Sequence, residues 1–187
     1  MPTKIMIGIP SGGMVHAKTA RTLVSLAQLF PTALFHFRHG NFSFENREKL
    51  ADSAVENKCT HLFLVDADMD FPADVLTSLL ELNKDIVGTH YNFRFLPLES
   101  TVRDIEGNPL LQVPSVPFQC SSVGSGCVLI KTNVFKAIEK PFYTWERDAE
   151  GTISATEDVL LCEKARGKGF EVWCAPLPVK HLGEYAF

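Results

Sequence analysis

The chain has 187 residues, of which 45% are hydrophobic and 21% are charged, so it has the length and apolar content of one globular domain. This composition excludes disordered and fibrous proteins. A formal net charge of −4 gives no overall attraction for nucleic acids or anionic membranes. No apolar run reaches the roughly 18 residues of a membrane span, so we expect a cytoplasmic protein without membrane insertion.

The first half of the chain alternates short β-rich apolar runs with amphipathic stretches. This pattern predicts parallel strands joined by crossover helices. The run at 61–65 is apolar throughout, as expected of a central strand covered on both faces. The expected strands are 4–9, 32–38, 61–65 and 85–91, and the expected helices are 19–30, 44–57 and 71–82.

The second half begins with a loosely patterned stretch, 93–119, which contains four prolines and predicts an extended excursion over the surface. A glycine-punctuated strand at 123–130 and a short helix at 132–140 are expected next. The segment 154–176 predicts a capped helix, a glycine stop and a last strand. Without repeats or linkers, the sequence predicts a single α/β domain over residues 1–187, with a mostly parallel central sheet flanked by helices.

The cysteines are odd in number and none forms a C-x-x-C pair, which argues against a disulfide framework and against a zinc knuckle. We expect mostly buried thiols. The cysteines are Cys59, Cys120, Cys127, Cys162 and Cys174.

The strongest chemical signal is HLFLVDADMDFP, in which Asp66, Asp68 and Asp70 follow a buried strand. In an open α/β sheet, ligands bind at the carboxyl ends of the strands. Three carboxylates within five residues repel one another, and a divalent cation with oxygen ligands neutralises them and can hold a diphosphate. Asp66 and Asp68 are separated by one residue, and we expect one of them to bind a metal while the other reaches a ribose.

Three alternatives use similar residues. An EF-hand loop would need a glycine where Phe71 stands and a bidentate glutamate at its twelfth position, which is missing. A haloacid-dehalogenase-like phosphatase also places D-x-D after an apolar strand, but it expects Thr or Val at Asp70 and usually opens its domain with that strand. The third alternative is that the acids stabilise the start of the next helix, which explains Asp70 better than it explains Asp66 and Asp68.

Several segments together carry a resemblance to a known family: IPSGGMV, ENREKLADSAVENKCTHLFLVDADMDFP, GSGCVLIKTNVF, TED before a helix, and the late VKHLG. In their order and spacing they resemble the GT-A glycosyltransferase superfamily, in particular small family-2-like members of bacteria and their phages. The resemblance covers nearly the whole chain. It implies a Rossmann-like GT-A fold, with a nucleotide-binding half at about 1–92 and an acceptor and catalytic half at about 93–187.

The resemblance places a metal and a nucleotide-diphosphate sugar at Asp66-Ala67-Asp68. Asp66 would contact the nucleoside or share the metal, and Asp68 would bind Mn²⁺ or Mg²⁺ bridging the donor's phosphates. His181, in VKHLG, matches a late metal-binding histidine; the alternative is an ordinary histidine near the end of the chain. An imidazole beside carboxylates suits Mn²⁺ better than Mg²⁺, which prefers six oxygen ligands.

Two glycine-containing segments would contact the donor. The first follows the opening strand, where such enzymes meet the base and ribose, and its alternative is a plain turn. The second would line the sugar pocket, because a strand without bulky side chains lets a ligand approach the backbone, and its alternative is a bulge. The residues are Pro10, Ser11 and Gly12 in the first segment, and Gly124, Ser125 and Gly126 in the second.

Arg47 stands where relatives often carry an arginine facing the nucleotide. The alternative is a solvated helix charge paired with Glu48 or Asp52.

Glu157 and Asp158 match the acidic pair at which inverting GT-A enzymes place their general base, and Asp158 is the predicted base. For Glu157 the alternative is a capping box with Ser154, in which Glu157 is structural while Asp158 acts. Trp145 is a candidate aromatic platform for an acceptor sugar, with a core tryptophan as the alternative.

The sequence therefore predicts a metal-dependent glycosyltransferase that moves a sugar from a nucleotide-diphosphate sugar to an acceptor hydroxyl, with inversion. The alternatives are a nucleotidyltransferase that makes nucleotide sugars and an inactive nucleotide-sugar-binding module. The acceptor stays open among a glycan, a protein and a modified nucleic acid. A phage-encoded chain would work in the host cytoplasm, and because the chain stops soon after His181 we also consider a homo-oligomer.

Overall fold

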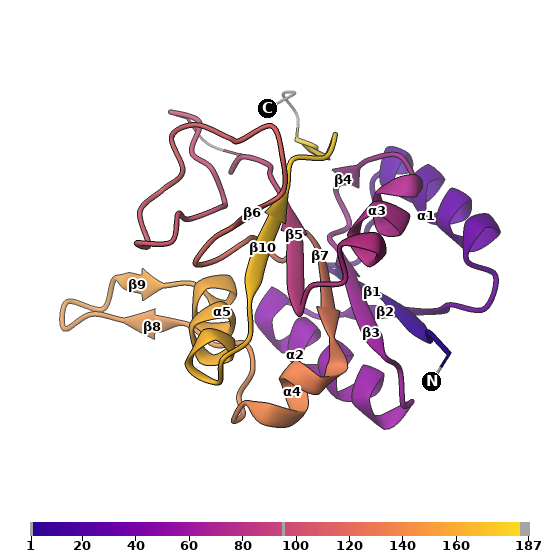
Figure 1. Ribbon diagram of the computed structural model, residues 1–187, viewed down its shortest axis with the longest axis horizontal. Coiled ribbons are helices and arrows are strands. Elements are labelled where there is room, and N and C mark those ends of the chain that lie inside the picture. Colours follow the sequence, from indigo (N-terminus) through magenta and orange to yellow (C-terminus); the bar gives the residue numbers. More distant parts are fainter. Residues whose placement is uncertain (1, 95, 184–187) are drawn as a thin grey trace.

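The structure of the protein, a computed structural model, describes residues 2–94 and 96–183. A seven-stranded sheet runs through the centre, and helices cover both of its faces (Figure 1). The helices are α1 (Ala17–Leu29), α2 (Ser43–Glu56), α3 (Asp74–Leu82), α4 (Thr132–Ala137) and α5 (Glu157–Gly167). The strands are β1 (Ile5–Ser11), β2 (Leu34–His39), β3 (His61–Val65), β4 (Met69–Asp70), β5 (Ile86–Thr89), β6 (Phe118–Gln119), β7 (Cys127–Lys131), β8 (Glu146–Arg147), β9 (Ile153–Ala155), β10 (Val172–Ala175) and β11 (Lys180–His181).

The strand order of the central sheet is β2-β1-β3-β7-β5-β10-β6. β1 runs parallel to β2 and to β3, and β5 runs parallel to β10. β7 is antiparallel to both β3 and β5, and β6 is antiparallel to β10. The mostly parallel sheet with flanking helices is confirmed, and β7 and β6 are the strands that run the other way.

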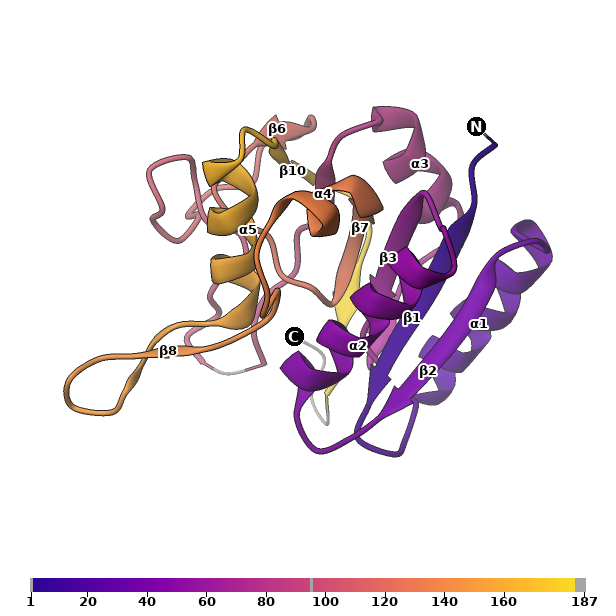
Figure 2. The same ribbon diagram turned by 90° about the horizontal axis from the view of Figure 1, so that it is seen from below.

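Helices cover the two faces of the sheet in two groups, α1 and α3 on one face and α2, α4 and α5 on the other (Figure 2). Alternate residues of β3 therefore enter different cores. Leu62 and Leu64 pack in the α2 core, whereas Phe63 and Val65 pack in the α1 core. All four side chains are fully buried, which confirms that this continuous apolar run is a strand covered on both faces.

Residues 93–94 and 96–119 form the predicted excursion as far as the structure describes it, with β6 at its end. The following strand begins at Cys127, four residues later than the predicted start at 123. The Gly126 amide donates to the Tyr91 hydroxyl at 2.7 Å, and the Gly126 carbonyl accepts from the Asp66 amide at 2.9 Å. The excursion thus returns the chain to the carboxyl end of β3, so β7 has to run back in the opposite direction.

The last described segment lies against the acidic motif. β11 pairs antiparallel with β4, so that His181 lies opposite Met69, and the Leu182 amide donates to the Asp68 carbonyl at 2.7 Å. This pairing fixes His181 beside Asp68.

The five cysteines are buried and unpaired, which confirms the expectation of buried thiols. Within the part of the chain that the structure describes, no helix is both long enough and apolar enough to cross a membrane.

Candidate active site

A pocket of about 440 Å³ opens where β1, β3 and β5 reach their carboxyl ends. It brings together predicted residues that are up to 171 positions apart, from Pro10 to His181. The predicted residues that line it are Pro10, Ser11, Gly12, Arg47, Asp66, Ala67, Asp68, Glu157, Asp158 and His181. Of the other predicted residues, Ser125, Gly126 and Trp145 lie directly beside it through their contacts with these side chains, and Gly124 lies against Tyr91, which lines the pocket.

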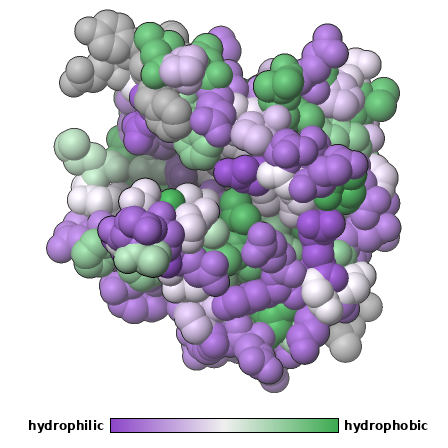
Figure 3. All heavy atoms as spheres, turned by 90° about the vertical axis from the view of Figure 1, so that its left-hand side faces the viewer, coloured by the Kyte–Doolittle hydropathy of each residue, from purple (hydrophilic) through white to green (hydrophobic). Residues whose placement is uncertain are grey.

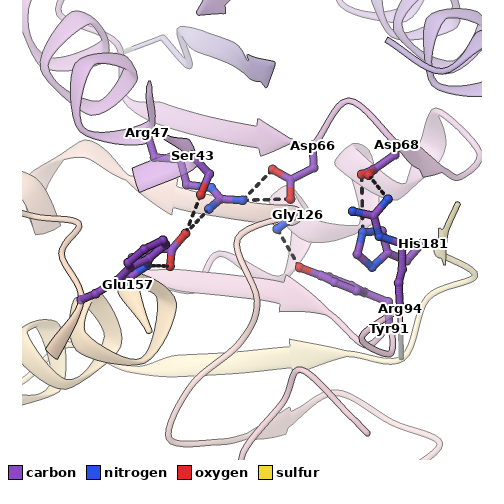
Figure 4. A network of polar contacts seen from close by, with 10 residues as sticks. Ser43, Arg47, Asp66, Asp68, Tyr91, Arg94, Gly126, Glu157 and His181 are labelled. Atoms are coloured by element: carbon purple, nitrogen blue, oxygen red, sulfur yellow. Dashed lines mark hydrogen bonds and ion pairs between the residues drawn. The ribbon is translucent and has the colours of Figure 1, made fainter. Parts of the chain in front are cut away.

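Arg47 joins the two acidic motifs. Its Nη2 donates to both carboxylate oxygens of Asp66 at 2.7 and 2.8 Å, and its Nη1 donates to Glu157 Oε1 at 2.6 Å (Figure 4). The Arg47 side chain is only 7% exposed. Burial acts to lower the pKa of Arg47, but the neighbouring carboxylates outweigh burial and hold that pKa above its usual value.

The position of Arg47 on α2 explains this contact. Arg47 shares the buried face of the helix with Leu50, Ala51 and Ala54, at spacings of three, four and seven residues. The alternative of a solvated charge is therefore wrong. Its suggested partner Glu48 instead accepts from two backbone amides, and Asp52 pairs with Lys140.

Glu157 is bound on every side of its carboxylate. Besides Arg47, its Oε1 accepts from Ser43 Oγ at 3.0 Å, and its Oε2 accepts from Trp145 Nε1. The capping-box alternative is wrong, because Thr156 is the N-cap residue of α5 and Ser154 lies in β9. The Glu157 carboxylate points to Arg47 because a buried guanidinium stabilises it more than a backbone amide would.

Asp158 is the next residue and lies in the first turn of α5. Its Oδ1 is buried and accepts no hydrogen bond within the described part of the chain. Burial raises the pKa of Asp158 to about 6, helped by the charges of Glu157 and Asp66 and opposed by Arg47 and by the Ser125 hydroxyl. A carboxylate with this pKa is suited to accept a proton near neutral pH.

Tyr91 lies between the glycine segment and His181, one of the predicted metal ligands. Its hydroxyl accepts from the Gly126 amide, and its ring lies edge-on to the His181 ring at a centroid distance of 5.5 Å. A Cβ added at Gly126 would lie 2.7 Å from the Tyr91 hydroxyl and 3.1 Å from Asp66 Oδ2. Glycine is therefore required here by close approach rather than by a bulge. No pattern in the sequence indicates Tyr91 as a site residue.

Asp68 lies on the side of the pocket away from Glu157 (Figure 4) and contacts two nitrogen-bearing side chains. Its Oδ1 is 3.5 Å from His181 Nε2, and its Oδ2 is 2.7 Å from Arg94 Nη1 (Figure 4). Burial acts to raise the pKa of Asp68, but His181 and Arg94 outweigh it and hold that pKa below its usual value. His181 Nδ1 lies 3.2 Å from the Asn92 carbonyl, which orients the ring with Nε2 toward Asp68.

Asp68 and His181 would supply two of the ligands that a divalent cation needs. A carboxylate and an oriented imidazole at 3.5 Å form a donor pair that suits Mn²⁺. Within residues 2–94 and 96–183, no three His, Cys, Asp or Glu side chains gather into one metal-binding group. Asp66, the third predicted ligand, has both oxygens on Arg47. A cation at Asp68 and His181 would therefore take its other ligands from phosphate and water.

Trp145 forms part of an aromatic group beside Glu157. Its ring centroid is 4.9 Å from that of Phe44, which in turn is 5.5 Å from that of Phe42. Trp145 is 36% exposed as a whole residue, so it is not the core tryptophan of the alternative.

A second pocket of about 410 Å³ lies on the other side of Thr156, which lines both pockets. Its walls come from the excursion, the β8–β9 hairpin and α5. They consist of Arg103, Ile105, Glu106, Gly107, Ser121, Ser122, Ile153, Ser154, Ala155, Thr156, Val159, Glu163 and Arg166.

No protein-family description and no curated protein matches the sequence. The fold does match solved structures. A197 from STIV superposes with a TM-score of 0.70 at 18% identity, covering 97% of this chain and 86% of that chain. Mannose-1-phosphate geranyltransferase from Thermus thermophilus gives a TM-score of 0.54 at 10% identity, covering 95% of this chain and 76% of that chain. GalNAc-T7 with UDP, GalNAc and Mn²⁺ gives 0.53 at 11% identity, covering 93% of this chain and 42% of that chain.

These likenesses concern the fold. They show that the chain has a GT-A-like α/β fold, as predicted. The chain spans less than half the length of the GalNAc-T7 chain.

Proposed function

We propose that this protein transfers a sugar from a nucleotide-diphosphate sugar to an acceptor hydroxyl, with the help of a divalent cation. The observation that carries the proposal is the pocket at the carboxyl ends of the strands. It is lined by Asp68 and His181 and also by Asp158, whose buried Oδ1 accepts no hydrogen bond within the described part of the chain. The GT-A-like fold supports the proposal, because GalNAc-T7, which shares the fold, is described with UDP, GalNAc and Mn²⁺.

The donor binds along the edge of the sheet in this account. Pro10, Ser11 and Gly12 contact the base and ribose, and Asp68 with His181 holds Mn²⁺ or Mg²⁺ near the diphosphate. A bound cation stabilises the negative charge of the departing nucleoside diphosphate. Arg47, which also lines the pocket, keeps the Asp66 and Glu157 carboxylates in place.

Asp158 acts as the general base. Its Oδ1 takes the proton of the acceptor hydroxyl as that oxygen attacks the anomeric carbon, which inverts the configuration at that carbon. The raised pKa of Asp158 matches this task, since a base works best when its pKa lies near the working pH. Glu157, held by Arg47, Ser43 and Trp145, fixes the start of α5 and with it the neighbouring carboxylate.

The acceptor enters through the second pocket. Because Thr156 lines both pockets, a ligand there has a short path to Asp158. Two arginines, two glutamates and several small polar residues line this pocket, which suits a hydroxyl-rich acceptor of low net charge. Figure 3 shows the molecule from the side of the excursion and of the β8–β9 hairpin, where hydrophilic residues predominate around a hollow. Trp145 offers its exposed ring at the border of the site.

The test is release of nucleoside diphosphate from UDP-, GDP-, CDP- and dTDP-sugars with Mn²⁺. The wild type is expected to release the diphosphate of one nucleotide class, by transfer to added acceptor glycans or to water. Asp158→Asn is expected to bind the same nucleotide sugar but to lose release. Formation of pyrophosphate from a nucleoside triphosphate and a sugar phosphate would instead identify a nucleotidyltransferase, and binding without any release would identify an inactive binding module.

A further inference from the structure

Arg94 makes contacts that the proposed reaction does not yet use. Its Nη1 lies 2.7 Å from Asp68 Oδ2 and donates to the Leu182 carbonyl at 3.2 Å. Arg94 lies at the start of the excursion, just after β5, and so links three segments at the donor end of the pocket (Figure 4). Its side chain is 47% exposed, in contrast to the buried Arg47.

The charges around the pocket show why Arg94 matters. The side chains that line the pocket include four carboxylates and two arginines, Arg47 and Arg94. Arg47 is bound on both sides by Asp66 and Glu157, so its charge is already used. A donor diphosphate that enters this pocket meets more negative than positive side-chain charge. Arg94 can become free to bind it, because a divalent cation can replace Arg94 as the partner of Asp68.

We propose that Arg94 is a displaceable counter-ion of Asp68: it competes with the divalent cation for that carboxylate and, once displaced, binds the donor diphosphate. The inference rests on the proposed function, because it assigns Arg94 a role toward the same donor. On this proposal Arg94 weakens binding of the cation alone and strengthens joint binding of the cation and the donor.

The geometry supports competition. Asp68 has two carboxylate oxygens; Oδ2 contacts Arg94, and Oδ1 faces His181. A divalent cation held by Asp68 and His181 repels a guanidinium 2.7 Å from the same carboxylate. Displacement is easy, because an ion pair with this much exposure changes an equilibrium constant by no more than about fivefold.

The geometry also supports diphosphate binding by the displaced side chain. The guanidinium is planar and offers forked donors that match phosphate oxygens. The backbone of Arg94 stays beside the cation site, because Asn92, two residues earlier, contacts His181 Nδ1. The side chain therefore needs to move only from the carboxylate to the phosphates next to it.

The first arm of the test measures Mn²⁺ alone by electron paramagnetic resonance on the whole chain. Arg94→Ala is expected to bind Mn²⁺ about threefold to fivefold more tightly than the wild type, because the competing cation is gone. The matched control is Arg21→Ala, which removes another exposed arginine paired with an aspartate of the acidic motif, Asp70 at 3.3 Å. This control should leave Mn²⁺ affinity unchanged.

The second arm measures UDP, GDP, CDP and dTDP by calorimetry with saturating Mn²⁺. For the nucleotide that the wild type binds, Arg94→Ala is expected to weaken binding about tenfold, and Arg94→Lys is expected to recover part of the loss. Thermal unfolding of each variant checks that it is folded.

The outcomes separate the two proposals. If no nucleoside diphosphate binds to the wild type, the proposed function fails, whereas the Mn²⁺ arm still decides whether Arg94 competes for Asp68. If Arg94→Ala binds Mn²⁺ no more tightly than the wild type, or the nucleotide as well as the wild type does, the inference on Arg94 is overturned. Failure of the wild type to bind Mn²⁺ overturns it as well.

Discussion

Replacing Arg47 by methionine tests whether the arginine bridge holds the site together. The substitution keeps a long apolar stem but leaves the Asp66 and Glu157 carboxylates, 24% and 9% exposed, without their partner. Breaking a buried ion pair costs roughly 3 to 5 kcal/mol. Asp66 can regain some hydration, so we expect the lower end, a loss of about 3 kcal/mol in the free energy of unfolding.

Urea unfolding at pH 7 measures this loss directly. In a chain of this length a loss of about 3 kcal/mol lowers the melting temperature by about 6 to 12 °C. The matched control is Lys84→Met, which removes the more exposed ion pair with Glu171 at 3.3 Å and is expected to cost less than about 1 kcal/mol. The double variant Arg47→Met/Glu157→Gln should recover part of the loss. A loss for Arg47→Met no larger than that of Lys84→Met would refute the reasoning.

Two further predictions concern Asp158 and Gly126. Burial raises the pKa of Asp158 to about 6, whereas the same carboxyl has a pKa of about 3.9 in an unfolded chain. Between about pH 3.9 and about pH 6, the folded protein therefore binds more protons than the unfolded chain, and its free energy of unfolding falls as the pH rises. Asp158→Asn should remove this dependence and stabilise the protein at pH 7 by about 1 to 3 kcal/mol in urea unfolding; unchanged pH dependence would contradict the assignment. Gly126→Ala should displace Tyr91 and cost about 1 to 3 kcal/mol in the same assay. Gly12→Ala, where a Cβ has nothing within 4 Å, is its control, and equal losses would contradict the close-approach argument.

The fold was largely predictable because its first half is locally patterned. The continuous apolar run of β3 and the amphipathic faces of α1 and α2 depend on neighbouring residues, and the structure keeps them within a few positions. The antiparallel direction of β7 was not predictable in this way. It depends on where the excursion brings the chain back, and that is set by contacts of Gly126 with Tyr91 and Asp66, which are distant in sequence.

Local patterns gave wrong partners for two site residues. Helix spacing pairs Arg47 with Glu48 or Asp52, and the capping-box pattern pairs Glu157 with Ser154. In the structure, the Arg47 and Glu157 side chains bind each other across 110 residues. One signal was present in the sequence, since Arg47 falls on the same helical face as Leu50, Ala51 and Ala54. A charge on an apolar face needs a buried partner.

Arg94 and Tyr91 carried no comparable signal. Arg94 stands at the start of the irregular excursion, and Tyr91 stands just before it, beyond the end of β5 at Thr89; no periodicity there indicates which side chains turn inward. Their roles depend on β11, which returns His181 and Leu182 to the acidic motif from the other end of the chain.

The central claim is that Asp68 belongs to a cation site for a nucleotide-diphosphate sugar, and a thermal-shift screen tests it most directly. The screen compares UDP-, GDP-, CDP- and dTDP-sugars with and without Mn²⁺ on the wild type, on Asp68→Asn and on the matched control Asp70→Asn. A ligand at a hundred times its dissociation constant stabilises a protein by about 2.7 kcal/mol, or about 5 to 11 °C at this size.

We predict that one nucleotide class stabilises the wild type and Asp70→Asn only with Mn²⁺, and that Asp68→Asn loses this stabilisation. Equal stabilisation of Asp68→Asn, or no stabilisation of the wild type by any nucleotide sugar, would contradict the claim.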